Sequence, residues 1–297
     1  MAQVEKNIFP SGYCKSVFFN CNYVVILETI HILYKRQLIT LLIPTLFIWS
    51  CMMVIRFAWV TTILLLCSAG LVAGEKLQPN EIIQKAVKAV GGKSAIAKMK
   101  ATYSEDNGIY YGMGEGLPYK GVYSFQLPDK MRMEIKGVFT IVLNGKKGWT
   151  SMMGETKAMP EKVLAVQQKD MKTHAVVALL PFINKKGFKF TPLGNVKIKG
   201  ADSIGLKVTK KGYDDVKLYF DAKNFLLNKA SYKSINAEQN FKEVTSDVYY
   251  SAYKKFNGMT VATKVELQLD GKRFLAMNIT EFRAVPMFDA KTFNKPE

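Results

Sequence analysis

Few side chains of this 297-residue chain are of the types that carry out chemistry. All of its cysteines lie within the first 67 residues, and only one of its two histidines follows them (Cys14, Cys21, Cys51 and Cys67; His31 and His174). A cysteine nucleophile, a cysteine-ligated metal site and a disulfide are therefore excluded after residue 67. A catalytic histidine needs a positioned nucleophile or carboxylate, and the sequence indicates neither for His174.

Two further patterns could bind a charged ligand. Gly112, Gly114 and Gly116 form a glycine run, but no helix pattern follows it, so a turn is favoured over a phosphate-binding loop. The pair Asp214-Asp215 could bind a cation, although a solvated turn explains it as well. We therefore expect no catalytic residue, no metal and no cofactor. An unrecognised hydrolase is the enzymatic alternative.

The basic charge of the chain indicates its partners. It has 42 Lys and Arg against 24 Asp and Glu, a net charge of +18, and 48% of its residues are hydrophobic. Only three arginines follow Glu75 (Arg132, Arg273 and Arg283). Nucleic-acid sites favour arginine for bidentate contacts, so nucleic acid is not expected. Lysines on outer strand faces promote solubility, and attraction to an anionic membrane surface is the functional alternative.

The first 74 residues have the pattern of a targeting segment. A short positive start at residues 53–56, an apolar run and small residues before Glu75 predict a signal peptide at 52–74, cleaved after Gly74. Residues 1–51 are interpreted as a start codon assigned too early. The alternative is a membrane segment at 37–55, which would tether the protein. We expect residues 75–297 to form a single domain in the periplasm.

Two helices are predicted in that domain. Asn80 is a plausible N-cap for a helix that runs to Val90 and ends at Gly91-Gly92, with one or two further turns at 94–100. The second candidate spans Pro160–Leu180, because proline suits a first helical position and Pro181 stops the run. Its apolar stripe would consist of Val163, Val166, Met171, His174, Val177 and Ala178.

The remaining sequence alternates between apolar and polar residues, which is typical of strands with one buried face. Met131 and Met133, for example, flank Arg132. Asn144-Gly145, Asn257-Gly258 and Asp270-Gly271 predict tight hairpins and hence antiparallel neighbours. About ten strands are expected, so the fold class is mainly β within α+β. A deep antiparallel sheet curled around a helix can leave an apolar concavity.

Methionines suit such a concavity, because they are flexible and accept varied apolar shapes. Eleven of the 14 methionines lie after residue 75. Ordinary core filling is the alternative role. An acyl chain gains about 0.8 kcal/mol for each buried CH₂ group, so lipid binding would need no reactive residue.

The order of motifs resembles that of the LolA-type outer-membrane lipoprotein-sorting proteins. Residues 121–135 read as a strand, a proline-containing turn and a strand, and 139–149 read as a strand with Asn-Gly-Lys before Trp149. The segments 216–221 and 293–296 also resemble that family, and the resemblance covers about residues 80–296.

This resemblance implies an incomplete antiparallel β-barrel with helices covering its concave apolar face. It also implies carriage of lipid chains or acylated lipoproteins across the periplasm. One position departs from the family, which has an arginine before the turn proline that helps to latch the helical lid. Here Leu127 precedes Pro128, so the latch is in question, and Arg132 is expected to face the opposite side of its strand.

We therefore predict a monomeric, non-enzymatic periplasmic lipid or lipoprotein carrier. The alternative is an envelope sensor or interaction domain whose concavity is filled by its own helices. The lid face would comprise four helical residues (Val163, Val166, Met171 and Val177). The cavity lining would comprise seven strand residues, with Trp149 packed near the rim (Tyr123, Phe125, Met131, Met133, Ile135, Ile141 and Leu143).

Overall fold

The computed structural model describes residues 77–184, 187–236 and 241–297. The expected signal peptide at 52–74, its cleavage after Gly74, the segment 1–51 and all four cysteines lie outside these residues. No helix among the described residues has the length and apolar character needed to cross a membrane.

Thirteen strands within the described residues form one antiparallel sheet. In chain order they are β1 (Ala101–Tyr110), β2 (Leu117–Gln126), β3 (Lys130–Ile135), β4 (Phe139–Asn144), β5 (Lys147–Met152), β6 (Glu155–Ala158), β7 (Lys189–Ile198), β8 (Ala201–Thr209), β9 (Val216–Asp221), β10 (Leu227–Asn236), β11 (Lys242–Phe256), β12 (Met259–Leu269) and β13 (Lys272–Ala284).

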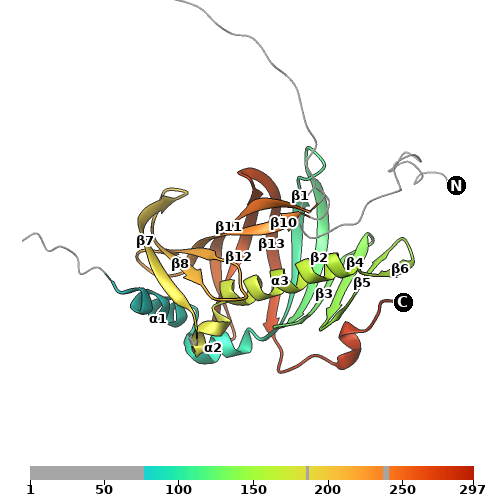
Figure 1. Cartoon of the computed structure of the whole chain (residues 1–297), viewed down its shortest axis with the longest axis horizontal. Coiled ribbons are helices and arrows are strands. Elements are labelled where there is room, and N and C mark those ends of the chain that lie inside the picture. The colour runs from blue at the N-terminus through green and yellow to red at the C-terminus, as the bar shows by residue number, and fades with distance from the viewer. Residues whose placement is uncertain (1–76, 185–186, 237–240) are drawn as a thin grey trace, which may run out of the picture. The chain divides into compact units, whose positions relative to one another are not determined.

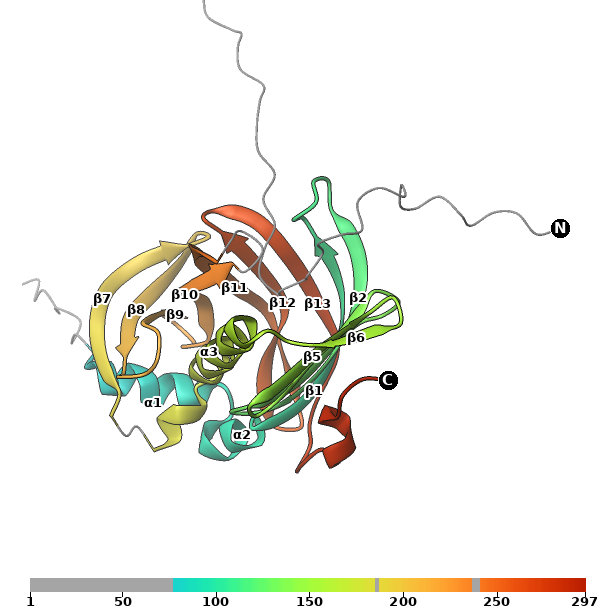
Figure 2. The ribbon, with the colours of Figure 1, turned by 45° about the vertical axis from the view of Figure 1, so that its right-hand side comes forward.

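The order across the sheet is β6-β5-β4-β3-β2-β1-β13-β12-β11-β10-β9-β8-β7. The edge strands β6 and β7 do not pair, so the sheet stays open, and Figure 2 shows it curling around a helix. The predicted class, a mainly β half-barrel with helices, is confirmed. The sheet has more strands than the expected ten, because β1, β5 and β6 do not alternate cleanly. In β1, for example, the charged Asp106 occupies a buried position.

Tight turns join neighbouring strands as predicted. Asn257-Gly258 and Asp270-Gly271 adopt positive φ angles at both residues, which is the conformation of the two-residue hairpin turn that matches sheet twist. The glycine run at 112–116 lies in the turn between β1 and β2. Asp214 and Asp215 each form an ion pair, with Lys169 and Lys207 respectively.

Three α-helices lie among the described residues: α1 (Pro79–Ala89), α2 (Gly92–Lys98) and α3 (Glu161–Val177). Helix α1 begins two residues earlier than predicted, with Gln78 rather than Asn80 at the N-cap. The reason is a capping box, in which the Glu81 side chain accepts a hydrogen bond from the backbone N–H of Gln78 at 2.8 Å. Pro160 is the N-cap of α3 rather than its first helical residue.

Helix α3 lies inside the curve of the sheet (Figure 1). It is followed by the short 3₁₀ helix η1 (Leu180–Ile183). One apolar cluster joins α1, the end of α3, η1 and strands β8–β10, with Phe182 and Phe220 at its centre. A second cluster joins α3 to strands β2–β4. A second 3₁₀ helix, η2 (Ala290–Phe293), packs near β3 and β4, where Asn144 donates a hydrogen bond to the Phe293 carbonyl at 3.1 Å.

Candidate functional site

A cavity of about 390 Å³ lies between α3 and the inner face of the sheet. Strands β1–β3 and β9–β13 supply one wall, and α3 supplies the other. Most of the lining side chains are methionine, aromatic or aliphatic. A volume of this size falls within the range of small-molecule sites, ~300–1,000 Å³.

Part of the predicted lining borders this cavity. Tyr123, Phe125, Met131 and Met133 come from β2 and β3, where cross-strand pairing places them on one face. Three other predicted lining residues do not border the cavity (Ile135, Ile141 and Leu143). Ile141 and Leu143 lie on β4, nearer the sheet edge, and pack directly beneath α3 in the second apolar cluster.

Trp149 lies on the opposite face of the sheet. It pairs with Val142, whose chain neighbours Ile141 and Leu143 point inward to the cluster beneath α3. Because successive strand residues face opposite sides, Val142 and Trp149 point away from the cavity. The expected position of Trp149 near the rim is therefore not found.

The lid helix also differs from the predicted apolar stripe. Met171 and Val177 border the cavity, whereas Val163 and Val166 do not. Instead, three polar residues of α3 line it together with Met171, Val177 and Ala178 (Gln167, Asp170 and His174). Their spacing of three and four residues places them on one helical face. His174 belonged to the predicted stripe, and the same periodicity could have identified Gln167 and Asp170 had further polar side chains been admitted.

His174 of α3 borders this partly open cavity. Its imidazole stacks on Phe125 with a centroid distance of 4.6 Å. His174 is an exposed residue, yet desolvation by the surrounding protein lowers its pKa to about 4. His174 is therefore neutral at pH 7, and the cavity wall it forms carries no positive charge.

The C-terminal strands supply lining residues that were not among the predicted ones, including Tyr250, Tyr253, Val265 and Met277. The Tyr253 hydroxyl donates a hydrogen bond to the Leu227 carbonyl at 2.6 Å, while burial raises the pKa of Tyr250. Alternation in β11–β13 predicted which residues share a face. It did not show that this face borders the same cavity as β2 and β3.

Position 127, where LolA-type proteins have the arginine that helps to latch the lid, makes an apolar contact in this structure. Leu127 is buried and belongs to the same cluster as Met171 and Ala175 of α3. Two polar contacts hold α3 from other sides: Gln168 donates to the Gly145 carbonyl at 2.8 Å, and Lys169 pairs with Asp214 at 2.7 Å.

A buried carboxyl lies on the same inner face, beside Tyr123. Asp106 is 2% exposed and accepts hydrogen bonds from the Tyr119 hydroxyl and the Gly121 N–H, each at 3.0 Å. Burial outweighs these bonds and raises its pKa to about 6. Gly121 is required here, because a Cβ atom at that position would overlap the carboxyl of Asp106.

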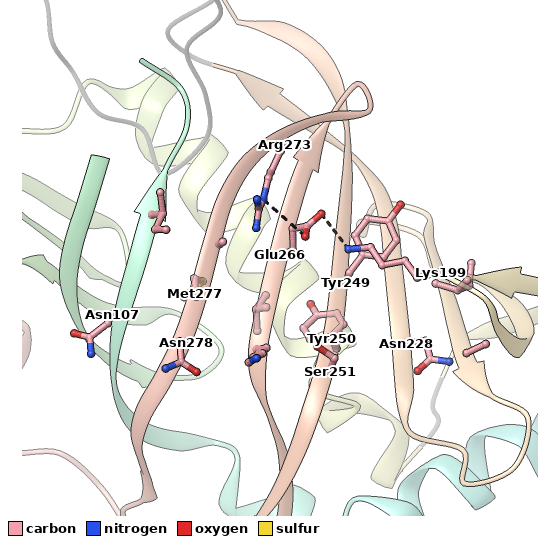
Figure 3. Close-up of a pocket in the computed structure, with 16 residues that line it drawn as sticks. Asn107, Lys199, Asn228, Tyr249, Tyr250, Ser251, Glu266, Arg273, Met277 and Asn278 are labelled. Carbon is pink, nitrogen blue, oxygen red and sulfur yellow. Dashed lines mark ion pairs between the residues drawn. The ribbon is translucent and has the colours of Figure 1, made fainter. Parts of the chain in front are cut away.

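A second hollow, of about 450 Å³, lies mainly on the outer face of β11–β13 (Figure 3). Glu266 is at its centre and pairs with Lys199 at 3.0 Å and Arg273 at 3.8 Å. Partial burial opposes ionisation of Glu266, but hydrogen bonds from Gln268 and Lys199 and the two positive charges lower its pKa. Lys264 also lines the hollow, so three basic side chains face the one carboxylate of Glu266 and the described lining carries a net positive charge.

Within the described ranges, no group of three or more His, Cys, Asp or Glu side chains is arranged to hold a metal ion. The inner cavity has mainly apolar walls with a few hydrogen-bonding groups.

Comparison with solved structures finds similar folds. A LolA superfamily protein from Nitrosomonas europaea is 14% identical, with 74% of this chain and 99% of that chain covered and a TM-score of 0.48. A putative outer membrane lipoprotein-sorting protein domain from Vibrio parahaemolyticus is 12% identical, with 73% and 96% covered and a TM-score of 0.46. A DUF1329 family protein from Desulfovibrio piger is 13% identical, with 73% and 98% covered and a TM-score of 0.48.

The names of two of these solved structures are of the LolA type that the order of motifs resembles. No family model matches the chain, and no curated protein matches its sequence. At these identities the evidence on function has to come from the cavity itself.

Proposed function

We propose that this protein is a non-enzymatic periplasmic carrier that binds lipid acyl chains, free or attached to lipoproteins. The observation that supports this proposal is the partly open apolar cavity between α3 and the sheet. Tyr123, Phe125, Met131 and Met133 would contact the chain from the sheet side. Met171 and Val177 would contact it from the lid.

The cavity is large enough for the burial of an acyl chain to contribute substantially to the free energy of binding. A methylene group occupies about the volume of a water molecule, ~30 Å³, so 390 Å³ accommodates about 13 of them. Burial at about 0.8 kcal/mol each gives a gross gain on the order of 10 kcal/mol. The costs of association and of ordering the chain reduce this gain.

The proposed carrier function also requires export of the protein to the periplasm. The signal peptide expected at 52–74 would deliver residues 75–297 to the periplasm, and exposed lysines would favour contact with an anionic membrane surface. Cleavage after Gly74 would free the carrier, whereas retention of residues 1–51 would tether it.

Native mass spectrometry of the full chain, expressed with its own N-terminus in a bacterial host, tests these points together. A mass that begins at Glu75 with adducts of lipid size supports secretion and carriage. A folded protein that shows no adduct, and takes up none when incubated with lipid, contradicts carriage.

Substitutions at two neighbouring residues distinguish lipid binding in the cavity from lipid binding on the outer surface. Met277 is half-buried and borders the cavity, while Asn278 is exposed and faces outward. Met277→Glu should reduce lipid retention at least tenfold, because an unpaired carboxylate in an apolar cavity is costly. Asn278→Glu should retain lipid as the parent protein does. Equal retention in both variants would mean that the lipid binds elsewhere.

A second candidate is an interaction domain that recognises a protein partner. One observation favours it: the concave face beside β8–β10 is filled by the chain itself, through α1, η1 and the end of α3. In that case the folded protein would carry no lipid, and Met277→Glu would leave partner binding unchanged.

A further inference from the structure

The charge of the cavity wall contrasts with that of the whole chain. The sequence contains 42 lysines and arginines. Among the described residues that line the cavity there is no lysine, arginine or glutamate, and Asp170 is the one acidic side chain. An anionic head group inside this cavity would therefore meet no positive partner from the described lining.

The wall does offer neutral hydrogen-bonding groups. The His174 imidazole contacts Phe125 and makes no hydrogen bond to another described residue. Desolvation keeps it neutral, with a pKa of about 4. Gln167 lies two turns before it on the same face of α3, and the Tyr250 hydroxyl comes from β11. Asp170, one turn before His174, is the acidic exception among these groups. His174 is an exposed residue that lines the cavity, so its imidazole is available to exchange a hydrogen bond with the head group of a bound ligand.

The volume limits the ligand as well. Space for about 13 methylene groups corresponds to one acyl chain of medium to long length. Two or three such chains would need a proportionately larger space.

We propose that the cavity selects single-chain lipids with an uncharged, hydrogen-bonding head group, such as a long-chain alcohol or a monoacylglycerol, and that His174 binds this head group. This inference rests on the proposed carrier function. It adds the chemical class of the ligand and a residue that recognises it.

Discrimination against an ionised head group follows from the desolvation of charge. A fatty acid carboxylate in the cavity would have no counter-ion, so the protonated acid would be the form that binds. A carboxyl with a pKa of about 4.3 is protonated in roughly one molecule in 10³ at pH 7.3. Apparent affinity for the acid should therefore be about 10³-fold below that for the matched alcohol.

Displacement of a neutral fluorescent probe, N-phenyl-1-naphthylamine, from the full chain measures this selectivity. The two competitors are 1-tetradecanol and myristate, which have the same number of carbon atoms. Between pH 8 and pH 5.5, affinity for myristate should rise about tenfold for each unit of pH that is removed. Affinity for tetradecanol controls for titration of the protein, including Asp170 and His174 in the wall and the nearby Asp106, whose pKa is about 6.

The outcomes are distinct. Binding of tetradecanol with weak, pH-dependent binding of myristate supports the selectivity. Equal binding of both at pH 8 overturns it but leaves the carrier function intact. Binding of neither contradicts the carrier function itself.

The role of His174 is tested by the ratio of the affinities for two ligands, with and without a hydrogen-bonding head group. A general loss of protein stability does not change this ratio. The parent protein should bind tetradecanol about tenfold more tightly than 1-chlorotetradecane, which has a similar chain but no strong hydrogen-bonding group. His174→Phe, which preserves stacking on Phe125, should abolish this preference. Lys172→Ala, on the exposed side of α3, should preserve it. A preference that survives His174→Phe would exclude His174 as the group that binds the head.

Discussion

Replacement of Asp106 by asparagine should stabilise the protein at neutral and alkaline pH. The carboxyl is 2% exposed, and its pKa is raised from 3.8 to about 6, mainly by burial. A raised pKa means that the folded protein holds this proton more tightly than the unfolded chain. The stability associated with the proton is fully present below pH 3.8 and is lost as the pH rises through 6.

The magnitude follows from the shift. A difference of about 2 pKa units corresponds to roughly 3 kcal/mol, so ionised Asp106 should cost the fold about 3 kcal/mol at pH 8 and about 1 kcal/mol at pH 4.5. Asparagine can still accept from the Gly121 N–H, and the Tyr119 hydroxyl can turn to accept from the new amide. The charge is removed while the local hydrogen bonds are retained.

Urea unfolding of parent and variant at several pH values checks this reasoning. The advantage of Asp106→Asn in the free energy of unfolding should grow by about 2 kcal/mol between pH 4.5 and pH 8. Asp202→Asn is the matched control, because Asp202 is an exposed partner of Lys197. A difference between Asp106→Asn and the parent that stays constant with pH would refute the assigned titration.

Two further substitutions test the packing that holds the lid. Phe182→Ala should lower the free energy of unfolding by about 3–5 kcal/mol, measured by urea unfolding, because Phe182 is 1% exposed and contacts Phe188 and Phe190 edge-on; a loss below 1 kcal/mol would contradict the assigned core. Gly91→Ala should reduce thermal stability more than Gly92→Ala. Both glycines have positive φ angles, but a Cβ atom would overlap the Gly258 carbonyl only at Gly91, and equal shifts in Tm would mean that this close approach does not matter.

The half-barrel could be predicted because its signals are local. Alternation in β3 placed Met131 and Met133 opposite Arg132, and Asn257-Gly258 and Asp270-Gly271 predicted hairpins whose backbone adopts the required positive φ angles. Strand β1 was less evident, since Asp106 occupies an inward position. Its burial depends on Tyr119 and Gly121 from β2, a contact that no pattern within β1 can show.

The site was predicted only in part, because the cavity depends on long-range arrangement. Met133 and Ile141 pair on the same face, yet only Met133 borders the cavity, since α3 covers the neighbouring strand directly. The sequence does not specify where along the sheet the helix rests. Helical spacing did include His174 in the stripe of the lid helix, but it gave no reason to add the polar Gln167 and Asp170, which also line the cavity.

Helix α3 both closes the cavity and belongs to the core, and its faces separate these roles. Met171 and Ala175 pack against β2–β4, while Val176 packs against α1 and β8–β10. Between these two contacts, His174 faces the cavity. Substitutions at Ala175 or Val176 should therefore act mainly on the free energy of unfolding. A substitution at His174 removes little packing and should act mainly on which ligand is bound, so the position on the helix determines which property a variant reports.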